Sequence, residues 1–378
     1  MIKILLLGST GSIGRQTLKF LEHNQDFKVV GLACKSNVDL VMRQAYQFSC
    51  VNVACVEGGR AFRFDGQTKF YSGRNALIDI TENTDFDLMV NAVVGIAGLL
   101  PTLIALKRGK KIALANKETL VTGGRFVNNY IKGFGGSIVP IDSEHSALMQ
   151  ALYVADRKHL AQLTITASGG ALRDYPLDKL SAVRIEEVLD HPNWKMGGKI
   201  TVDCATMVNK AFEVIEAHYL FDLPYNKISA VIHRESIIHG MATFTDGTTS
   251  AILGRPDMTL PIALALYHPN RPQHCIEPLD FASLGQLSID RISEERYPLY
   301  YLIKEAVQKD ESYCVLVNAL DECAVDAFLC NKISYDGIYK IIRKGIEDFV
   351  PLKINSPQDI FELDREIRTR FNDGFIIG

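Results

Sequence analysis

The chain has 378 residues, of which 47% are hydrophobic and 22% are charged, as in folded globular proteins, and its length predicts about two to three domains. A net charge of −3 and the lack of a basic run argue against binding to nucleic acid or to an anionic membrane. No stretch reaches the roughly 20 apolar residues of a membrane span. The eight cysteines include no Cys-x-x-Cys pair, which indicates buried thiols in a cytoplasmic protein.

The first element predicted is a buried parallel strand over the apolar run 2–7. The loop 8–14, Gly-Ser-Thr-Gly-Ser-Ile-Gly, follows, and residues 15–23 have helical character. Strand, glycine loop and helix in this order are typical of dinucleotide sites, where N–H groups at the helix start meet the pyrophosphate. The spacing Gly-x-x-Gly-x-x-Gly departs from the usual fingerprint, so a purely structural glycine turn is the alternative.

The second predicted strand, 27–33, ends in Cys34-Lys35-Ser36-Asn37. An NAD site usually has an acid at this place, where it binds the ribose 2′-hydroxyl. Lys35, Ser36 and Asn37 instead supply a cation, a hydroxyl and an amide, which suit a 2′-phosphate and favour NADP. A solvated loop lysine is the alternative interpretation.

Further strand and helix units follow with short loops. Residues 86–94 predict a strand, 99–107 a helix and 111–115 another strand, which ends in Asn116-Lys117-Glu118. Repeated βα units indicate a doubly wound parallel sheet, so we expect an α/β protein with a Rossmann-like NADP-binding domain over residues 1–140. The Asn-Lys-Glu group would then lie on the ligand-binding edge of the sheet.

The strand predicted over 137–141 leads directly into two acids one residue apart, Asp142 and Glu144. Side chains at i and i+2 of an extended segment point the same way, so the two carboxylates can converge. Hard oxygen ligands of this kind suit Mg²⁺ or Mn²⁺. The alternative is that both residues simply cap the helix predicted after them.

Two further segments have binding chemistry. A strand over 163–167 ends in Ser168 and two glycines, whose backbone N–H groups can hold an anion. The loop 191–198 contains the only tryptophan and ends in a glycine pair; we interpret it as a lid over a substrate, with a loop folded over a core corner as the alternative.

A helix is predicted from residue 203 to residue 219. Asn209, Lys210 and Glu213 are spaced so that they share one face of it. An amide, an ammonium and a carboxylate together suit a phosphorylated, hydroxylated substrate and a third metal ligand. A surface ion pair between Lys210 and Glu213 is the alternative.

We predict an α+β catalytic and metal-binding domain over 141–268, a linker over 269–293 and a helical C-terminal domain over 294–378, in which the sequence shows no chemistry. Taken in order, the motifs closely resemble those of the 1-deoxy-D-xylulose 5-phosphate reductoisomerase family. The segments that carry the resemblance are Gly8–Gly14, Asn91–Gly95, Ala115–Glu118, Asp142–Ala147, Ala167–Gly170, His191–Trp194, Ala205–Met207 with Asn209, Lys210 and Glu213, and Gly254–Met258.

The resemblance implies an NADPH-dependent enzyme of non-mevalonate isoprenoid biosynthesis. It would rearrange and reduce 1-deoxy-D-xylulose 5-phosphate to 2-C-methyl-D-erythritol 4-phosphate. The family forms V-shaped homodimers with a mobile loop over the site, so a homodimer with its dimer contacts in residues 141–268 is implied. Both a concerted ketol shift and cleavage with re-addition fit these residues.

The resemblance also implies residue roles. Metal ligands would be Asp142, Glu144 and Glu213, and catalytic residues Lys117, Glu144 and His191. Substrate contacts would be Lys117, Ser143, Glu144, Ser168, His191, Cys204, Asn209, Lys210 and Glu213. Contacts with NADPH would be Thr10, Gly11, Ser12, Ile13, Lys35, Ser36, Asn37, Asn116, Glu118 and Gly197.

Two departures from the family pattern stand out. Cys204 occupies a phosphate-binding position where serine is common, and a thiol is a weaker hydrogen-bond donor than a hydroxyl. Ala171-Leu172 stands where Pro-Phe is usual. Two other functions compete with the implied one: a metal-free NADP dehydrogenase for another metabolite, and a nucleotide-sensing regulator without turnover. The regulator could dispense with the three acids, which are all present.

Overall fold

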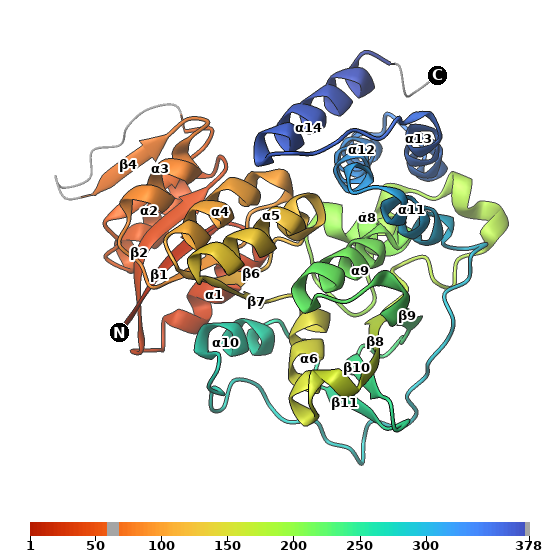
Figure 1. Ribbon diagram of the computed structural model, residues 1–378, viewed down its shortest axis with the longest axis horizontal. Coiled ribbons are helices and arrows are strands. Elements are labelled where there is room, and N and C mark those ends of the chain that lie inside the picture. Colours follow the sequence, from red (N-terminus) through yellow and green to blue (C-terminus); the bar gives the residue numbers. More distant parts are fainter. Residues whose placement is uncertain (59–67, 375–378) are drawn as a thin grey trace. The chain divides into compact units, whose positions relative to one another are not determined.

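A computed structural model describes residues 1–58 and 68–374, which form two compact units (Figure 1). The first unit comprises Met1–Leu120, Gly124–Ser146 and Asp257–Glu277. The second comprises Val121–Gly123, Ala147–Pro256 and the chain from Pro278 onward. In the described ranges, no helix combines the length and the apolar character needed to cross a membrane.

The first unit contains a parallel sheet of seven strands in the order β4-β3-β2-β1-β5-β6-β7. β1 lies where the strand order reverses, and its residues Ile4–Leu7 are fully buried because both faces of the sheet are covered. The predicted doubly wound architecture is confirmed. The strands are β1 (Ile2–Leu7), β2 (Phe27–Cys34), β3 (Asn52–Cys55), β4 (Lys69–Ser72), β5 (Leu88–Asn91), β6 (Lys111–Leu114) and β7 (Ser137–Pro140).

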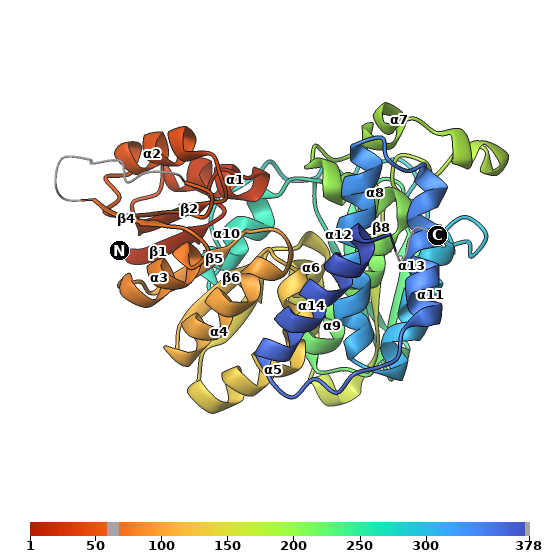
Figure 2. The ribbon, with the colours of Figure 1, turned by 90° about the horizontal axis from the view of Figure 1, so that it is seen from above.

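Helices cover both faces of this sheet, with α1 and α2 on one side and α3 and α4 on the other (Figure 2). α10 packs on α1, β6 and β7, so residues 257–277 group with the first unit, whereas the sequence division placed 141–268 together. The helices of this unit are α1 (Ser12–Leu21), α2 (Val38–Gln47), α3 (Ala76–Asn83), α4 (Leu99–Lys107), α5 (Glu118–Phe134) and α10 (Thr259–Tyr267).

The second unit is built on a four-stranded sheet in the order β11-β10-β8-β9, in which only the β8–β9 pair is parallel. Helix α9 packs on β8 and β9. The strands are β8 (Leu160–Ala167), β9 (Ile228–Ile232), β10 (Ile238–Phe244) and β11 (Thr249–Leu253).

The C-terminal helices surround α12, which packs against α8, α11, α13 and α14. Their predicted helical character is confirmed. The boundary between the two units falls inside α6. Its residues up to Ser146 belong to the first unit, and its residues from Ala147 belong to the second. The helices are α6 (Ser143–Ala151), α7 (Ile185–Leu189), α8 (Gly198–Thr206), α9 (Val208–Phe221), α11 (Pro298–Lys309), α12 (Ser312–Leu329), α13 (Tyr335–Asp348) and α14 (Pro357–Asn372).

The single helix predicted from 203 to 219 is wrong. The segment contains the end of α8 and most of α9, separated at Met207, whose φ of 63° lies in the left-handed region. No glycine or proline marks this break in the sequence.

The later part of the predicted linker is fixed to the second unit. Ile232 and Asp290 exchange two backbone hydrogen bonds of 2.9 Å, and Ser288 Oγ donates to Glu235 Oε1 at 2.8 Å. Nδ1 of the buried His233 lies 2.7 Å from the Ser288 carbonyl oxygen. Residues 288–290 are therefore part of the packed structure of this unit.

Candidate active site

The glycine loop brings backbone unusually close to backbone. Gly8 has a φ of 85°, and a Cβ added there would lie 2.3 Å from the carbonyl oxygen of Ala92. A Cβ on Gly14 would lie 2.2 Å from the Gly8 oxygen. Helix α1 begins at Ser12 with no acid in its first turn and with no capping hydrogen bond from the Gly11 position. The start of α1 therefore offers N–H groups and a positive helix dipole to an anion, as a pyrophosphate requires.

Of the residues that follow β2, Lys35 is exposed to solvent and Asn37 caps a helix. The Lys35 side chain is 80% exposed, with Nζ 3.5 Å from Glu57 Oε1. Asn37 caps α2, because its Oδ1 accepts a hydrogen bond from the Leu40 N–H at 3.1 Å. Lys35 is thus the available cation at this strand end, and the Asn37 side chain uses its Oδ1 to cap α2.

Asn116 holds the loop that follows β5. Its fully buried Nδ2 donates to the carbonyl oxygens of Val93 and Gly95 and to Glu118 Oε2, each at 3.0 Å. Its Oδ1 accepts from the Thr119 N–H at 3.1 Å. The Asn116 side chain therefore positions the sheet edge, and its backbone is the part left for a cofactor.

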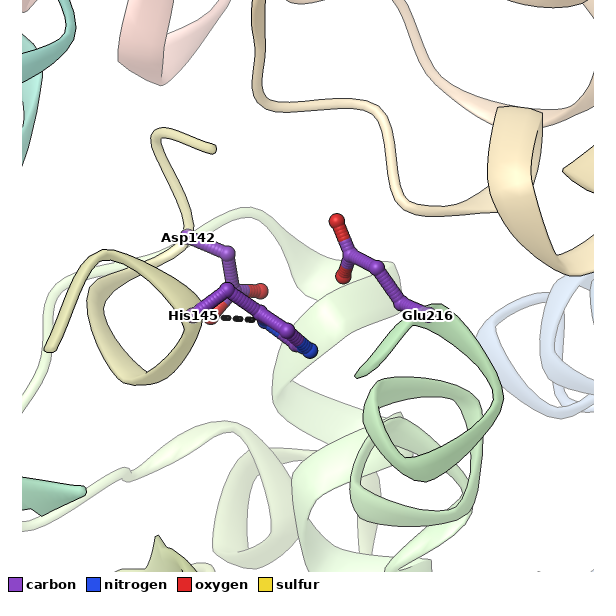
Figure 3. Close-up of side chains that lie close together, drawn as sticks. All are labelled: Asp142, His145 and Glu216. Atoms are coloured by element: carbon purple, nitrogen blue, oxygen red, sulfur yellow. Dashed lines mark ion pairs between the residues drawn. The ribbon is translucent and has the colours of Figure 1, made fainter. Parts of the chain in front are cut away.

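Lys117 and Asp142 form a buried ion pair. Their Nζ and Oδ2 atoms are 2.5 Å apart, and the side chains are 9% and 11% exposed. Nδ1 of the fully buried His145 lies 3.5 Å from Asp142 Oδ1 (Figure 3). Burial raises the pKa of Asp142, but the charges of Lys117 and His145 outweigh it and hold this pKa well below its usual range. Asp142 is therefore a carboxylate at neutral pH.

Glu213 is bound by two neighbours on its own helix. Asn209 Nδ2 donates to Glu213 Oε1 at 2.5 Å, and Lys210 forms an ion pair with Oε2. The shared helix face predicted for these three residues is confirmed. The alternative of a surface ion pair is wrong, because Lys210 and Glu213 are 3% and 1% exposed.

Two sets of three side chains could hold a cation. One ligand atom from each of Asp142, Glu144 and Glu213 lies within 4.8 Å of the others, and so does one from each of Asp142, His145 and Glu216 (Figure 3). The first set offers only carboxylate oxygens, which Mg²⁺ and Mn²⁺ prefer, whereas the second includes an imidazole nitrogen. The first set is also the predicted one. Helix α6 begins at Ser143. Asp142 and Glu144 therefore also lie at the start of a helix, as the capping alternative predicts.

The side chains of Ser168 and His191 form a hydrogen-bonded pair. His191 Nδ1 accepts from the N–H groups of Asn193 at 3.2 Å and Trp194 at 3.0 Å, so the ring proton of the neutral imidazole belongs on Nε2. Nε2 lies 3.0 Å from Ser168 Oγ, which also accepts from the Gly170 N–H at 3.2 Å. With two hydrogen bonds accepted, the Ser168 hydroxyl keeps its own hydrogen for a ligand. Burial and then Arg173 lower the pKa of His191 to about 4, so the ring is neutral at physiological pH.

The predicted lid lies against the turn after β9. Asn193 Nδ2 donates to the Arg234 carbonyl oxygen at 2.6 Å and to Ser236 Oγ at 2.7 Å. The ring of Trp194 packs edge to face against the ring of His239, with 6.3 Å between the two ring centroids. At the end of this loop Gly197 is the N-cap of α8. Its motion as a lid stays a prediction.

The Ser168 loop touches the end of α8. A Cβ on Gly170, whose φ is 72°, would lie 2.6 Å from the carbonyl oxygen of Cys204. Arg173 and Tyr297, which sequence reasoning missed, also hold this loop: Arg173 Nη1 donates to the Ser168 carbonyl oxygen at 3.0 Å and Tyr297 Oη to that of Gly169 at 2.8 Å. Neither residue belongs to a motif, and Tyr297 lies more than a hundred residues away, so no local signal marks them.

Three family models match the chain: "1-deoxy-D-xylulose 5-phosphate reductoisomerase" over residues 4–124, its "C-terminal domain" over 138–221, and "DXP reductoisomerase C-terminal domain" over 253–370. The chain is 42% identical to a 1-deoxy-D-xylulose 5-phosphate reductoisomerase of Bacillus pumilus over 374 residues. It is 43% identical to one of Geobacillus kaustophilus over 373 residues. Each alignment covers 97% of both chains.

Solved structures give the same result. A crystal structure of DOX-P reductoisomerase with NADPH, fosmidomycin and magnesium has a TM-score of 0.92 and 33% identity, and covers 99% of this chain and 98% of its own. The reductoisomerase of Zymomonas mobilis in complex with NADPH has a TM-score of 0.88 and 33% identity, and covers 98% of this chain and 97% of its own.

Proposed function

Because the chain belongs to the 1-deoxy-D-xylulose 5-phosphate reductoisomerase family, we propose that the residues described above bind NADPH, a divalent metal and the phosphorylated sugar. The enzyme converts 1-deoxy-D-xylulose 5-phosphate to 2-C-methyl-D-erythritol 4-phosphate and depends on NADPH and a divalent metal. The observation that carries the residue assignment is the set of three carboxylates, Asp142, Glu144 and Glu213, gathered around one point.

The cofactor binds along the carboxyl edge of the seven-stranded sheet. The close approach of backbone at Gly8 and Gly14 and the uncapped start of α1 support a pyrophosphate position over Thr10–Ile13. The exposed Lys35 and the neighbouring Ser36 support a 2′-phosphate, and hence NADPH rather than NADH. Glu118 and Gly197, with the backbone of Asn116, complete the proposed contacts.

The substrate phosphate binds where α8, α9 and the Ser168 loop meet. The spare hydrogen of the Ser168 hydroxyl, the amide of Asn209 and the ammonium of Lys210 supply donors of the kind that phosphate accepts. Cys204 at the end of α8 adds a thiol, which donates weakly. His191 acts through Ser168, because its Nε2–H fixes the direction of that hydroxyl.

The chemistry takes place on the carbon skeleton beside the acids. A bound Mg²⁺ or Mn²⁺ would be held by Asp142, Glu144 and Glu213 and would supply Lewis-acid polarisation of the substrate's ketone. Lys117 places an ammonium beside Asp142, where it stabilises negative charge on substrate oxygens or relays a proton. Ser143, whose hydroxyl donates to Glu144, keeps that carboxylate oriented. The protein orients the nicotinamide so that hydride reaches the new aldehyde.

The enzyme is a cytoplasmic homodimer that accepts Mn²⁺ as well as Mg²⁺. All eight cysteines lie in the described part of the chain and none is in a disulfide, which supports a reducing compartment. Tyr153 and Val154 are 64% and 67% exposed, and adjacent exposed apolar side chains support a subunit contact.

A single assay tests this function. We expect loss of NADPH absorbance when the purified protein meets 1-deoxy-D-xylulose 5-phosphate with Mg²⁺ or Mn²⁺, and none after chelation. Glu213→Gln should lower turnover far more than NADPH affinity, because it removes a metal ligand and leaves the cofactor loop intact. Equal losses of both would contradict the role given to Glu213, and metal-independent oxidation would contradict the metal site.

A further inference from the structure

Helix α2 has one polar side chain on its buried face. The buried residues of this helix are Val41, Met42, Gln44 and Ala45, and Gln44 is 7% exposed. Burial of an amide destabilises a fold unless its donor and its acceptor both find partners. A leucine would fit the same apolar surroundings without this requirement, so the contacts of the amide account for a glutamine at this position.

Both ends of the Gln44 amide bind Ser9 in the glycine loop. Ser9 Oγ donates to Gln44 Oε1 at 2.8 Å, and Gln44 Nε2 donates to the Ser9 carbonyl oxygen at 3.0 Å. Ser9 is fully buried, and its N–H donates to the carbonyl oxygen of Ala33 in β2 at 2.9 Å. Every polar group of Ser9 is therefore held by β2 or by α2.

The bond to the Ser9 carbonyl oxygen fixes the direction of the next N–H group. The Ser9–Thr10 peptide bond is trans, and in a trans peptide the C=O and the following N–H point in opposite directions. Since the carbonyl oxygen points at Gln44, the Thr10 N–H points away from it. Within the described ranges this N–H donates to no protein group, whereas the N–H of Gly11 donates to the Gly8 carbonyl oxygen at 3.1 Å.

We infer that Gln44 is a positioning residue for the cofactor, because it turns the Ser9–Thr10 peptide so that the Thr10 N–H is left for an oxygen of the NADPH pyrophosphate. This inference rests on the proposed position of the pyrophosphate over Thr10–Ile13. It adds to that proposal a residue of α2 that acts through the backbone of the glycine loop.

The effect of Gln44 should be common to the two nicotinamide cofactors. NADPH and NADH contain the same pyrophosphate and differ in the ribose 2′-phosphate, for which Lys35 and Ser36 are proposed. Loss of the Gln44 amide should therefore weaken both cofactors by the same factor, whereas Lys35→Ala should weaken NADPH more than NADH. The ratio of the two affinities separates a role at the pyrophosphate from a role at the 2′-phosphate.

The main variant is Gln44→Met, and its matched control is Gln47→Met on the same helix. Methionine has the length of glutamine but no N–H to donate to the Ser9 carbonyl oxygen. We expect Kd for NADPH to rise about tenfold in a fluorescence titration, because a hydrogen bond to a charged group is misdirected. Gln47 is exposed and its Nε2 donates to Glu22 Oε1 at 2.6 Å, so Kd in the control should stay within about twofold of wild type.

A third variant, Ser9→Ala, separates the direction of the peptide from the stability of the loop. It removes the hydroxyl but keeps the bond from Gln44 Nε2 to the carbonyl oxygen of residue 9. Both Ser9→Ala and Gln44→Met leave a buried polar group without its partner, so both should lower Tm. Gln44→Met alone lets the peptide turn, so it should lose clearly more NADPH affinity. Its KM for NADPH should rise by the same factor as Kd, with a much smaller change in kcat.

One readout requires no variant. On NADPH binding to the wild-type protein, the Thr10 amide proton should move downfield in a nitrogen–proton correlation spectrum, because it then donates to a charged oxygen. An amide proton that stays in place would overturn the inference even if Gln44→Met did not fold.

The affinities provide further outcomes that would overturn the role of Gln44. These are an unchanged Kd for NADPH in a folded Gln44→Met, a loss of affinity for NADPH without one for NADH, and equal losses of NADPH affinity in Gln44→Met and Ser9→Ala. If the wild-type protein binds neither cofactor, the proposed function fails instead. The Tm values of the variants would then still report on the two hydrogen bonds between Ser9 and Gln44.

Discussion

Removal of Lys117 tests the electrostatics at the carboxyl end of the sheet. In Lys117→Met the carboxylate of Asp142 keeps its burial but loses an ammonium at 2.5 Å. Breaking a buried ion pair from one side costs about 3–5 kcal/mol of folding free energy. For a unit of this size, each kcal/mol lowers Tm by about 2–4 °C, so the metal-free variant should melt about 6–20 °C below wild type.

The assay is thermal unfolding followed by circular dichroism, with chelator and again with Mg²⁺. Mg²⁺ should recover part of the loss, because a cation that binds the native acids stabilises the folded state. Lys3→Met is the matched control: Lys3 forms an ion pair with Asp85, but both side chains are exposed, and its Tm should match wild type. A metal-free Lys117→Met that melts with wild type would refute the argument that Asp142 depends on this lysine.

Two further predictions concern the glycine loop and the imidazole. Gly14→Ala places a Cβ 2.2 Å from the Gly8 carbonyl oxygen, so this variant should lose about 1–3 kcal/mol of folding stability and bind NADPH more weakly in a fluorescence titration. In the control Gly11→Ala the added Cβ lies 3.3 Å from the same oxygen, so the loss of stability should be smaller. Equal losses of stability in the two variants would contradict the packing argument. His191 has a folded pKa of about 4 against an ordinary 6.5, so the unfolded chain binds more protons between these values, and the stability present above pH 6.5 is lost as the pH falls toward 4. His191→Asn should remove this slope from the melting temperatures, and an unchanged slope would assign it to another group.

The sequence was most informative where local pattern and burial coincide. Residues 4–7 of β1 are all apolar because they are buried on both faces of the sheet, and the glycine loop follows because side chains at Gly8 and Gly14 would collide with neighbouring backbone. The helix spacing of Asn209, Lys210 and Glu213 likewise placed the three on one face, since residues three and four apart are neighbours on a helix. Each of these features depends on residues close together in the chain.

Features that depend on distant contacts escaped prediction. α10 is apolar all round, so its sequence says that it is buried but not that it packs on the first unit. The segment near Ser288 has no regular secondary structure, as a linker would, but Glu235 and His233, more than fifty residues earlier, hold it. Asn116 could be placed at the sheet edge from the sequence, but the commitment of its side chain to the loop after β5 could not.

The break at Met207 explains how one short segment serves two purposes. In a continuous helix, Asp203 and Lys210, seven residues apart, would lie on the same side, and the two charges would face a common surface. The left-handed residue ends α8 and starts α9, so Asp203 joins Lys199 and Asp321 while Lys210 pairs with Glu213. A left-handed methionine costs about 1–2 kcal/mol, and the surroundings of this 2% exposed side chain must hold it there. The strain at Met207 thus separates the charges that dock α8 on α12 from the charges that face the proposed substrate and metal.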